Sequence, residues 1–248
     1  MAEAVRIAMW SGPRNLSTAM MRSFSSRADC AVSDEPFYGA YLKTSGAPHA
    51  MAAEIMADMD CYWHSVAATM RGPAPRSKPV WYQKHMTHHM VGPTDIMDFP
   101  DHVHAFLIRD PDLMVASYLH KNELVDAEQL GFGRLVDYHK RISDYLGRAA
   151  PVVDANDILA NPAGLLPVLC AAIGISWDRA MFGWHAGRHP CDGIWASHWY
   201  HAVEKSTGFG APTAFSPLAC SARAIAEQCR ADYDYLAGFK LMAIEKGA

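Results

Sequence analysis

The chain has 248 residues, half of them apolar and 19% charged, and these proportions exclude a disordered protein. The 22 basic residues are outnumbered by 26 acidic ones, and the net charge of −4 argues against a broad nucleic-acid-binding surface while leaving room for a small anion site. No stretch approaches the roughly 20 apolar residues of a membrane span. Six scattered cysteines without a CxxC pair indicate reduced thiols, so we expect a cytoplasmic protein.

The predicted elements alternate between strands and helices. Short apolar runs predict strands at Val5–Trp10, Cys30–Ser33, Val80–Lys84, Val103–Ile108 and Val152–Val153. Helical patterns begin at residue 16 and cover 49–70, 113–120, 129–148 and 217–241, with another helix opening at 161–162, whereas 71–79 and 175–216 are irregular. This alternation predicts an α/β fold with a mainly parallel sheet, and we expect a single domain over residues 1–248.

The first chemically informative segment follows the first predicted strand. It reads Ser11-Gly12-Pro13-Arg14-Asn15-Leu16-Ser17-Thr18 and leads into a predicted helix. A helix N-terminus presents unpaired N–H groups and the positive end of a dipole, so a loop that enters it from a strand can wrap an anion. Arg14 and the hydroxyls of Ser17 and Thr18 add further donors. The Lys of a nucleoside-triphosphatase loop is missing, which disfavours ATP or GTP hydrolysis. An ordinary strand-to-helix turn is the alternative.

A second candidate for anion binding follows the fourth predicted strand. Arg109 comes directly after this strand, at the carboxyl end where open α/β sheets place their ligands. Ser117 lies eight positions further on, within the next predicted helix. If the chain folds back there, Arg109 and Ser117 can hold one phosphate between them. A surface Arg–Asp pair with an unrelated helical serine is the alternative.

Together these two segments resemble the P-loop sulfotransferase family. That family has a Pro-[Lys/Arg]-x-x-[Ser/Thr]-[Ser/Thr] loop after its first strand, matched by residues 13–18, and an Arg-[Asp/Asn]-Pro…Ser-Tyr segment after a later strand, matched by residues 109–118. The resemblance covers about residues 5–160. The runs at 10–14, 34–36 and 84–85 are also similar to sulfotransferase-like proteins joined to, or associated with, branched-chain aminotransferase sequences.

The resemblance implies an architecture and a sulfuryl donor. The architecture is a three-layer sandwich like that of the P-loop nucleoside triphosphatases, and the donor is 3′-phosphoadenosine 5′-phosphosulfate (PAPS). The resemblance assigns the 5′-phosphosulfate to Gly12, Pro13, Arg14, Asn15, Leu16, Ser17 and Thr18, and the 3′-phosphate to Arg109 and Ser117. Members often carry Gly where this chain has Leu16, and glycine lets the backbone approach a ligand closely. Leu16 could narrow the site or change the donor.

Candidates for charge stabilisation and proton transfer follow the third predicted strand. Many members place a Lys and a His there, and the resemblance assigns Lys84 to the charge on the transferred group. His85 is one candidate base. Because it directly follows Lys84, strand alternation aims the two side chains to opposite faces unless the strand has ended, in which case His88 is the substitute. For either imidazole the alternative is an exposed or core histidine.

Glu35, after the second predicted strand, is the rival base. Some sulfotransferases use a carboxylate from about this region, and such a carboxylate needs a raised pKa or a short hydrogen bond to serve well. The alternative is an acidic turn that precedes Pro36. The sequence does not decide between Glu35 and the two histidines.

These observations predict a sulfotransferase that moves a sulfuryl group from PAPS to a hydroxyl or amine of a small-molecule acceptor. The catalytic candidates are Arg14, Lys84, His85 and Glu35. A non-catalytic nucleotide-binding module of the same fold and a kinase-like phosphotransferase are the alternatives. Histidine and cysteine spacings match no zinc motif, so we expect no metal, and we expect no nucleic-acid or membrane partner. The acceptor's identity and the oligomeric state are not predicted.

Overall fold

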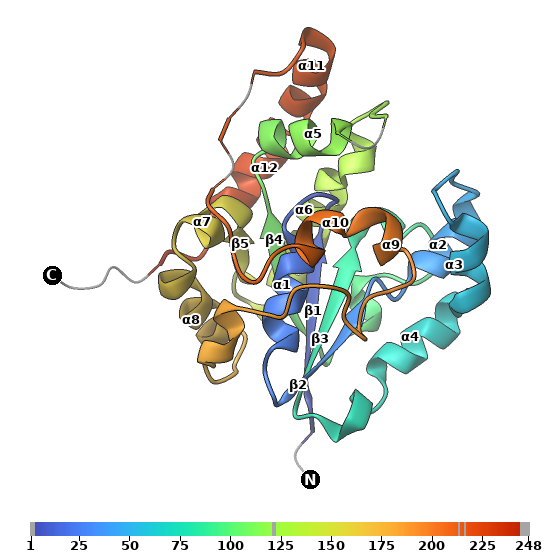
Figure 1. Cartoon of the computed structure of the whole chain (residues 1–248), viewed down its shortest axis with the longest axis vertical. Helices are drawn as coiled ribbons and strands as arrows, with labels where there is room; N and C mark the ends of the chain where they lie inside the picture. The colour runs from blue at the N-terminus through green and yellow to red at the C-terminus, as the bar shows by residue number, and fades with distance from the viewer. Residues whose placement is uncertain (1–2, 121–122, 213, 216, 244–248) are drawn as a thin grey trace, which may run out of the picture.

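Five parallel strands form one sheet in the order β2-β3-β1-β4-β5 (Figure 1). The computed structural model describes residues 3–120, 123–212, 214–215 and 217–243. The strands are β1 (Val5–Ser11), β2 (Cys30–Asp34), β3 (Val80–Met86), β4 (Val103–Ile108) and β5 (Val152–Asp154). The predicted α/β fold with a parallel sheet is confirmed, and every pairing within the sheet is parallel.

Helices cover both faces of the sheet and complete the predicted three-layer sandwich (Figure 1). One face packs against α1 (Ser17–Ser25), α7 (Ala155–Ala160) and α8 (Pro162–Ala172), and the other against α4 (Trp63–Arg71), α5 (Pro111–Leu119), α6 (Phe132–Leu146) and α12 (Arg230–Ala237). The remaining helices are α2 (Tyr38–Ser45), α3 (Ala52–Asp58), α9 (Ala196–Trp199), α10 (His201–Glu204) and α11 (Cys220–Gln228).

Side chains of the central strands alternate between the two faces. On β1, Ile7 and Met9 join the core beneath α1, while Ala8 and Trp10 join the core on the opposite face. All four side chains are fully buried, because both faces of the sheet are covered. This explains why the strands appear in the sequence as continuous apolar runs.

Two predicted helices are divided in the structure. The predicted helix at 49–70 is interrupted between α3 and α4, where Met59 adopts an extended conformation. The carboxylate of Asp60 accepts a hydrogen bond from the backbone N–H of Tyr62 at 2.9 Å, which stabilises a turn in place of continued helix. The predicted helix at 217–241 likewise divides into α11 and α12 at Cys229.

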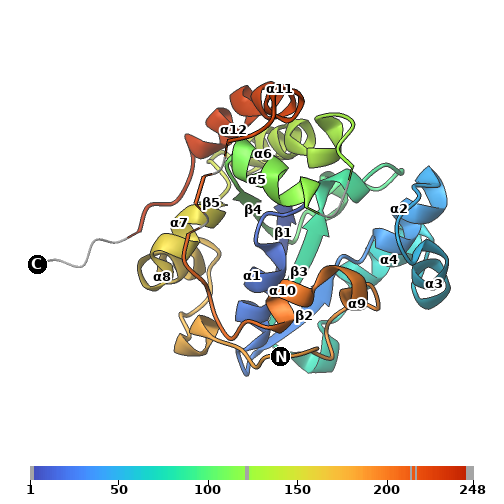
Figure 2. The same cartoon turned by 45° about the horizontal axis from the view of Figure 1, so that its top comes forward.

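Residues 183–204, which we call the strap, cross the α1 face of the molecule (Figures 1 and 2). Ser26 on the α1 side donates a hydrogen bond to the Gly183 carbonyl at 2.6 Å, and Arg22 pairs with Asp192 at 2.6 Å. Further along, the Gly193 N–H donates to the Asp34 carboxylate at 3.2 Å, at the carboxyl end of β2. The strap therefore brings a late part of the sequence to the same edge of the sheet as the loop after β1.

Candidate active site

The loop between β1 and α1 adopts a backbone conformation that few side chains favour. Arg14 and Leu16 both have positive φ, at 62° and 66°. Such angles cost a residue with a Cβ about 1 kcal/mol, so the surrounding structure must hold the loop in place. Gly12 is required for a different reason, since a Cβ there would lie 2.3 Å from the Leu130 carbonyl oxygen. Leu16 stands where members of the resembled family often carry Gly, and its φ angle is one that suits glycine.

The loop offers backbone donors without a hydrogen-bond acceptor among the residues that the structure describes. Within the described residues, the N–H groups of Arg14, Asn15 and Leu16 donate no hydrogen bond. Helix α1 begins at Ser17, and no side chain caps its N-terminus. Alternating signs of φ turn successive N–H groups toward one concavity, and an uncapped helix end adds its dipole to them. This arrangement suits an anion.

The structure brings Arg109 and Ser117 to this loop, although both lie about a hundred residues further along the sequence than Arg14. Arg14 Nε donates to Ser117 Oγ at 3.0 Å, and Arg109 Nη1 donates to the Arg14 carbonyl at 2.8 Å. Asn15, which is fully buried, donates to the Leu107 carbonyl of β4 at 3.0 Å. Burial lowers the pKa of Arg109, and the nearby Arg14 lowers it further. An anion bound between the two guanidinium groups would relieve this repulsion.

Lys84 lies near the carboxyl end of β3, with its side chain almost fully buried on the α1 face. Its Nζ lies 3.0 Å from Asp34 Oδ1 and 2.7 Å from Glu35 Oε1. It also lies 2.7 Å from the Tyr200 hydroxyl and 3.2 Å from Thr18 Oγ1. Burial alone would lower the pKa of Lys84, but the two carboxylates raise it well above its usual value. Lys84 therefore keeps its charge next to the start of α1.

Glu35 is the more accessible of the two carboxylates beside Lys84, with 12% of its side chain exposed. It follows β2 with a φ of 45°, and its backbone N–H donates to the Lys84 carbonyl at 3.0 Å. Its Oε2 lies 3.9 Å from Nδ1 of His89. Glu35 thus lies between a buried cation and a buried imidazole.

The structure does not bring His85 to this group of residues. Strand β3 continues to Met86, so strand alternation aims His85 away from Lys84 toward the opposite face. There its ring stacks on Trp10 with centroids 4.5 Å apart, and its Nε2 lies 3.1 Å from Gln83 Oε1. Burial lowers the pKa of His85 well below its usual value.

His88 and His89 form a short turn directly after β3. It is His89 that approaches Glu35, and its ring stacks against Tyr38 and Tyr41 with centroids 4.5 Å and 4.7 Å away. His88 packs edge-on against His89 at 4.4 Å. Burial lowers the pKa of both imidazoles well below the usual value, so both rings are neutral at pH 7.

Sequence reasoning missed three residues of the site: Asp34, His89 and Tyr200. Asp34 and His89 adjoin residues that the sequence did single out, so their positions at strand ends were the available signal. Tyr200 lies 116 residues from Lys84 and had no local signal, because its place depends on the path of the strap. Within the described residues, no group of three or more His, Cys, Asp or Glu side chains could hold a metal ion.

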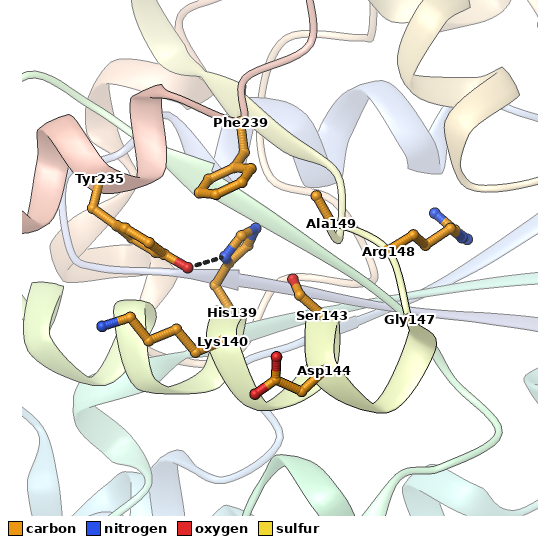
Figure 3. Close-up of a pocket in the computed structure, with 9 residues that line it drawn as sticks. All are labelled: His139, Lys140, Ser143, Asp144, Gly147, Arg148, Ala149, Tyr235 and Phe239. Carbon is orange, nitrogen blue, oxygen red and sulfur yellow. Dashed lines mark hydrogen bonds between the residues drawn. The ribbon is translucent and has the colours of Figure 1, made fainter.

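A separate cavity of about 600 Å³ lies between α6 and α12 (Figure 3). His139 donates from Nε2 to the Ala150 carbonyl and accepts at Nδ1 from the Tyr235 hydroxyl, and Phe239 lies against its ring. Because α6 ends just before β5 begins, this cavity lies at the amino edge of the sheet. It contains none of the predicted site residues, which gather at the carboxyl edge.

The part of the chain that the structure describes contains no helix long and apolar enough to cross a membrane.

Comparisons with known proteins agree with the resemblance seen in the sequence. Two relatives from Arabidopsis thaliana, branched-chain-amino-acid aminotransferase-like proteins 2 and 1, are 33% and 34% identical over 207 and 216 residues. These alignments cover 82% and 86% of this chain but only 36% and 38% of the relatives' own lengths.

The fold comparison points the same way. The crystal structure of a sulfotransferase from Alicyclobacillus acidocaldarius has a TM-score of 0.55 at 13% identity, with 97% of this chain and 98% of that one covered, and this likeness concerns the fold alone. A family model described as a sulfotransferase domain matches residues 5–233, which is most of the sequence. The chain belongs to the sulfotransferase domain family.

Proposed function

We propose that this chain transfers a sulfuryl group from PAPS to a hydroxyl or amine of a small-molecule acceptor. One observation carries the proposal: the loop after β1 and the buried cation of β3 meet, with Thr18 Oγ1 of α1 3.2 Å from Lys84 Nζ. An anion held by the loop would therefore lie beside a fixed ammonium group. Sulfuryl transfer resembles phosphoryl transfer, in which positioning and electrostatic stabilisation supply most of the catalysis.

The residues present fit such a donor. The unpartnered N–H groups of residues 14–16 and the Arg14 guanidinium can hold the 5′-phosphosulfate, together with the hydroxyls of Ser17 and Thr18. Arg109 and Ser117, both in contact with Arg14, can hold the 3′-phosphate. The φ of 66° at Leu16 supports the same use of the loop, because the residue adopts the backbone shape that glycine would have there.

Proton transfer falls to Glu35 in this proposal. The acceptor oxygen or nitrogen forms a bond to sulfur while the bond from sulfur to the donor's bridging oxygen breaks, and 3′-phosphoadenosine 5′-phosphate (PAP) leaves with that electron pair. The acceptor proton passes to the Glu35 carboxylate, and Lys84 stabilises the charge of the group in transit. His85 lies on the opposite face of the sheet and takes no part. His88, buried edge-on against His89, is not needed either.

The replacement Arg14→Ala tests the donor site. We expect the dissociation constant for PAP, measured by calorimetry, to rise by about 10- to 100-fold, because a charge-assisted contact is lost. The matched control is Arg148→Ala, an exposed arginine at the opposite edge of the sheet, which should bind PAP like the wild type. Equal PAP affinity in Arg14→Ala and wild type would contradict the assignment of this loop.

Two outcomes would favour the alternative functions. PAP binding without turnover across phenols, alcohols and amines would indicate a non-catalytic nucleotide-binding module. Magnesium-dependent consumption of ATP would indicate a kinase-like phosphotransferase. A single domain over residues 1–248 and a cytoplasmic location both stay predictions.

A further inference from the structure

The hydroxyl of Tyr200 joins the strap to the buried charges at the ends of β2 and β3. It lies 2.7 Å from Lys84 Nζ, 3.2 Å from Trp195 Nε1, and 2.9 Å and 2.7 Å from the two oxygens of Asp34. A phenol has one proton to donate and can accept two hydrogen bonds. Ammonium and indole N–H groups can only donate, so Tyr200 accepts from Lys84 and Trp195 and donates to Asp34.

The same count settles the protons of Lys84. Its ammonium group has three N–H donors but four acceptors within reach. Asp34 and Tyr200 take two of the donors, and they are themselves buried and linked by a hydrogen bond. The third N–H is shared between Glu35 Oε1 and Thr18 Oγ1, of which Glu35 is the partly exposed partner and Thr18 lies on the anion-binding side. This third N–H lies between Glu35 Oε1 at 2.7 Å and Thr18 Oγ1 at 3.2 Å, and it is the one that can change partner.

The backbone of the strap also contributes a hydrogen bond to this group of side chains. The Gly193 N–H donates to Asp34 Oδ2 at 3.2 Å, so that carboxylate receives hydrogen bonds from Lys84, Tyr200 and the strap backbone. The side chains of Asp34 and Lys84 are 2% and 1% exposed. A buried polar group that is fully hydrogen-bonded has little freedom to reorient. Two of the three N–H groups of Lys84 are therefore fixed in direction, and only the third can change its partner.

We propose that Tyr200 and Asp34 are positioning residues that aim the third N–H of Lys84 at the group in transit on the loop. Binding of PAPS moves this N–H from Glu35 to a sulfonate oxygen of PAPS. The Glu35 carboxylate is then free to take the proton of the molecule that receives the sulfuryl group. This inference rests on the proposed function. It adds that the strap, through Tyr200, completes a site whose other parts come from the first half of the chain.

The replacement Tyr200→Phe tests this role, with Tyr233→Phe as the matched control. Tyr233 also donates to a buried aspartate, Asp154, at 2.9 Å, but it has no contact with Lys84. Transfer of radiolabelled sulfate from PAPS is measured with the best acceptor among a phenol, a primary alcohol and an amine, or with water where none is accepted. We expect kcat to fall by about 10- to 100-fold in Tyr200→Phe while KM for PAPS and the dissociation constant of PAP stay near wild type.

The pH profile supplies a readout that a purely structural role would not move. The groups that face Asp34 are Lys84 and Tyr82 on β3, Glu35 beside it, and Cys191, Asp192 and Tyr200 on the strap. Burial raises the pKa of Asp34, while the Tyr200 hydroxyl stabilises the carboxylate and lowers it. Removing this hydroxyl raises the pKa of Asp34 further. The acid limb of the kcat profile should therefore move to higher pH in Tyr200→Phe and stay in place in Tyr233→Phe.

A second measurement requires no turnover. Titration of the Asp34 carboxyl carbon by NMR should give a higher pKa in Tyr200→Phe than in wild type. The variant Asp34→Asn, which keeps the side-chain shape, should lower kcat without weakening PAP binding. Unchanged kcat in both variants, or an unchanged Asp34 titration, would overturn the positioning role. Failure of the wild-type protein to bind PAP would instead contradict the proposed function, and the NMR titration would still decide how Tyr200 acts on Asp34.

Discussion

Lys84 and His85 are neighbours on one strand, yet they belong to two chemically different regions of the molecule. On the α1 face, Lys84 lies among two carboxylates and two hydroxyl groups. On the opposite face, His85 lies among aromatic rings, with Trp10 at 4.5 Å and Phe37 and Phe99 at about 6 Å. Both side chains are almost fully buried. The two side chains differ in their neighbours, which are carboxylates and hydroxyl groups around Lys84 and aromatic rings around His85.

The comparison shows two ways in which a sheet can bury an ionisable side chain. A lysine buried without partners would lose its proton, and here Asp34 and Glu35 prevent this by raising its pKa above the usual value, against the effect of burial. An imidazole can be buried neutral, and burial lowers the pKa of His85 accordingly. The charged arrangement is available for binding an anion, whereas the neutral one contributes to the core.

Removing the cation of the charged region should have the largest effect on stability. We expect Lys84→Met to lower the free energy of unfolding by about 3–5 kcal/mol, because the buried carboxylate of Asp34 and the partly buried one of Glu35 then lack their cation. Urea denaturation at pH 7 measures this effect. Lys140→Met, at an exposed lysine, is the control and should change stability by about 0.5 kcal/mol or less.

A double variant separates the loss of charge pairing from the loss of packing. Adding Asp34→Asn to Lys84→Met removes one of the stranded charges and should recover part of the lost stability. If Lys84→Met is as stable as the Lys140→Met control, the carboxylates are not held by this ammonium group and the comparison fails.

Much of the fold was predictable because its signals are local. The apolar run at Val103–Ile108 coincides with β4, and the other four predicted strands lie within β1, β2, β3 and β5. Both faces of the sheet are covered, so successive residues of a central strand are buried and the strand appears in the sequence as a continuous apolar run. The two helix breaks at Met59 and Cys229 were not predicted. At the first, the turn made by the Asp60 side chain interrupts the helix without altering the apolar pattern around it.

The candidate site divides in the same way. Arg14, Arg109 and the serines after β1 and β4 come after strands, and Lys84 lies near the end of β3. A parallel sheet gathers such residues at one edge. Tyr200 comes from a segment without regular pattern, and only the path of the strap places it beside Lys84. The orientation of His85 depended on where β3 ends, which a run of mixed residues does not reveal.

Low pH should lower the stability of the fold through His104, which lies next to Trp10 on the aromatic face of the sheet. Its Nδ1 accepts from Trp10 Nε1 and its Nε2 lies 3.0 Å from the Phe99 carbonyl, to which it donates. Burial lowers its pKa from 6.5 to about 4, although the Phe99 carbonyl partly opposes this. Between these values the unfolded chain binds a proton that the folded protein does not, so stability falls as the pH drops from about 6.5 to 4. This one group contributes on the order of 3 kcal/mol to the fall.

Urea denaturation of wild type and His104→Gln at pH values from 7 to 4.5 measures the contribution of His104. We expect a shallower loss of stability with falling pH in the variant, because the titrating ring has been removed. The control is His64→Gln at an exposed position, which should follow the wild-type slope. Equal slopes in His104→Gln and wild type would mean that this imidazole is not held neutral by the fold.

The smallest effect should come from His85→Leu, which replaces the neutral ring with an apolar side chain. Its contact with Gln83 Oε1 at 3.1 Å is lost, so we expect a decrease in stability of about 1 kcal/mol. Sulfuryl turnover should be close to wild type, because the ring lies across the sheet from Lys84. Glu35→Gln provides the opposite result, since it keeps the side-chain shape, removes the carboxylate next to Lys84, and should lower kcat strongly. If His85→Leu loses turnover and Glu35→Gln retains it, proton transfer belongs to the aromatic face, and the face that carries Lys84 serves only to bury its charge.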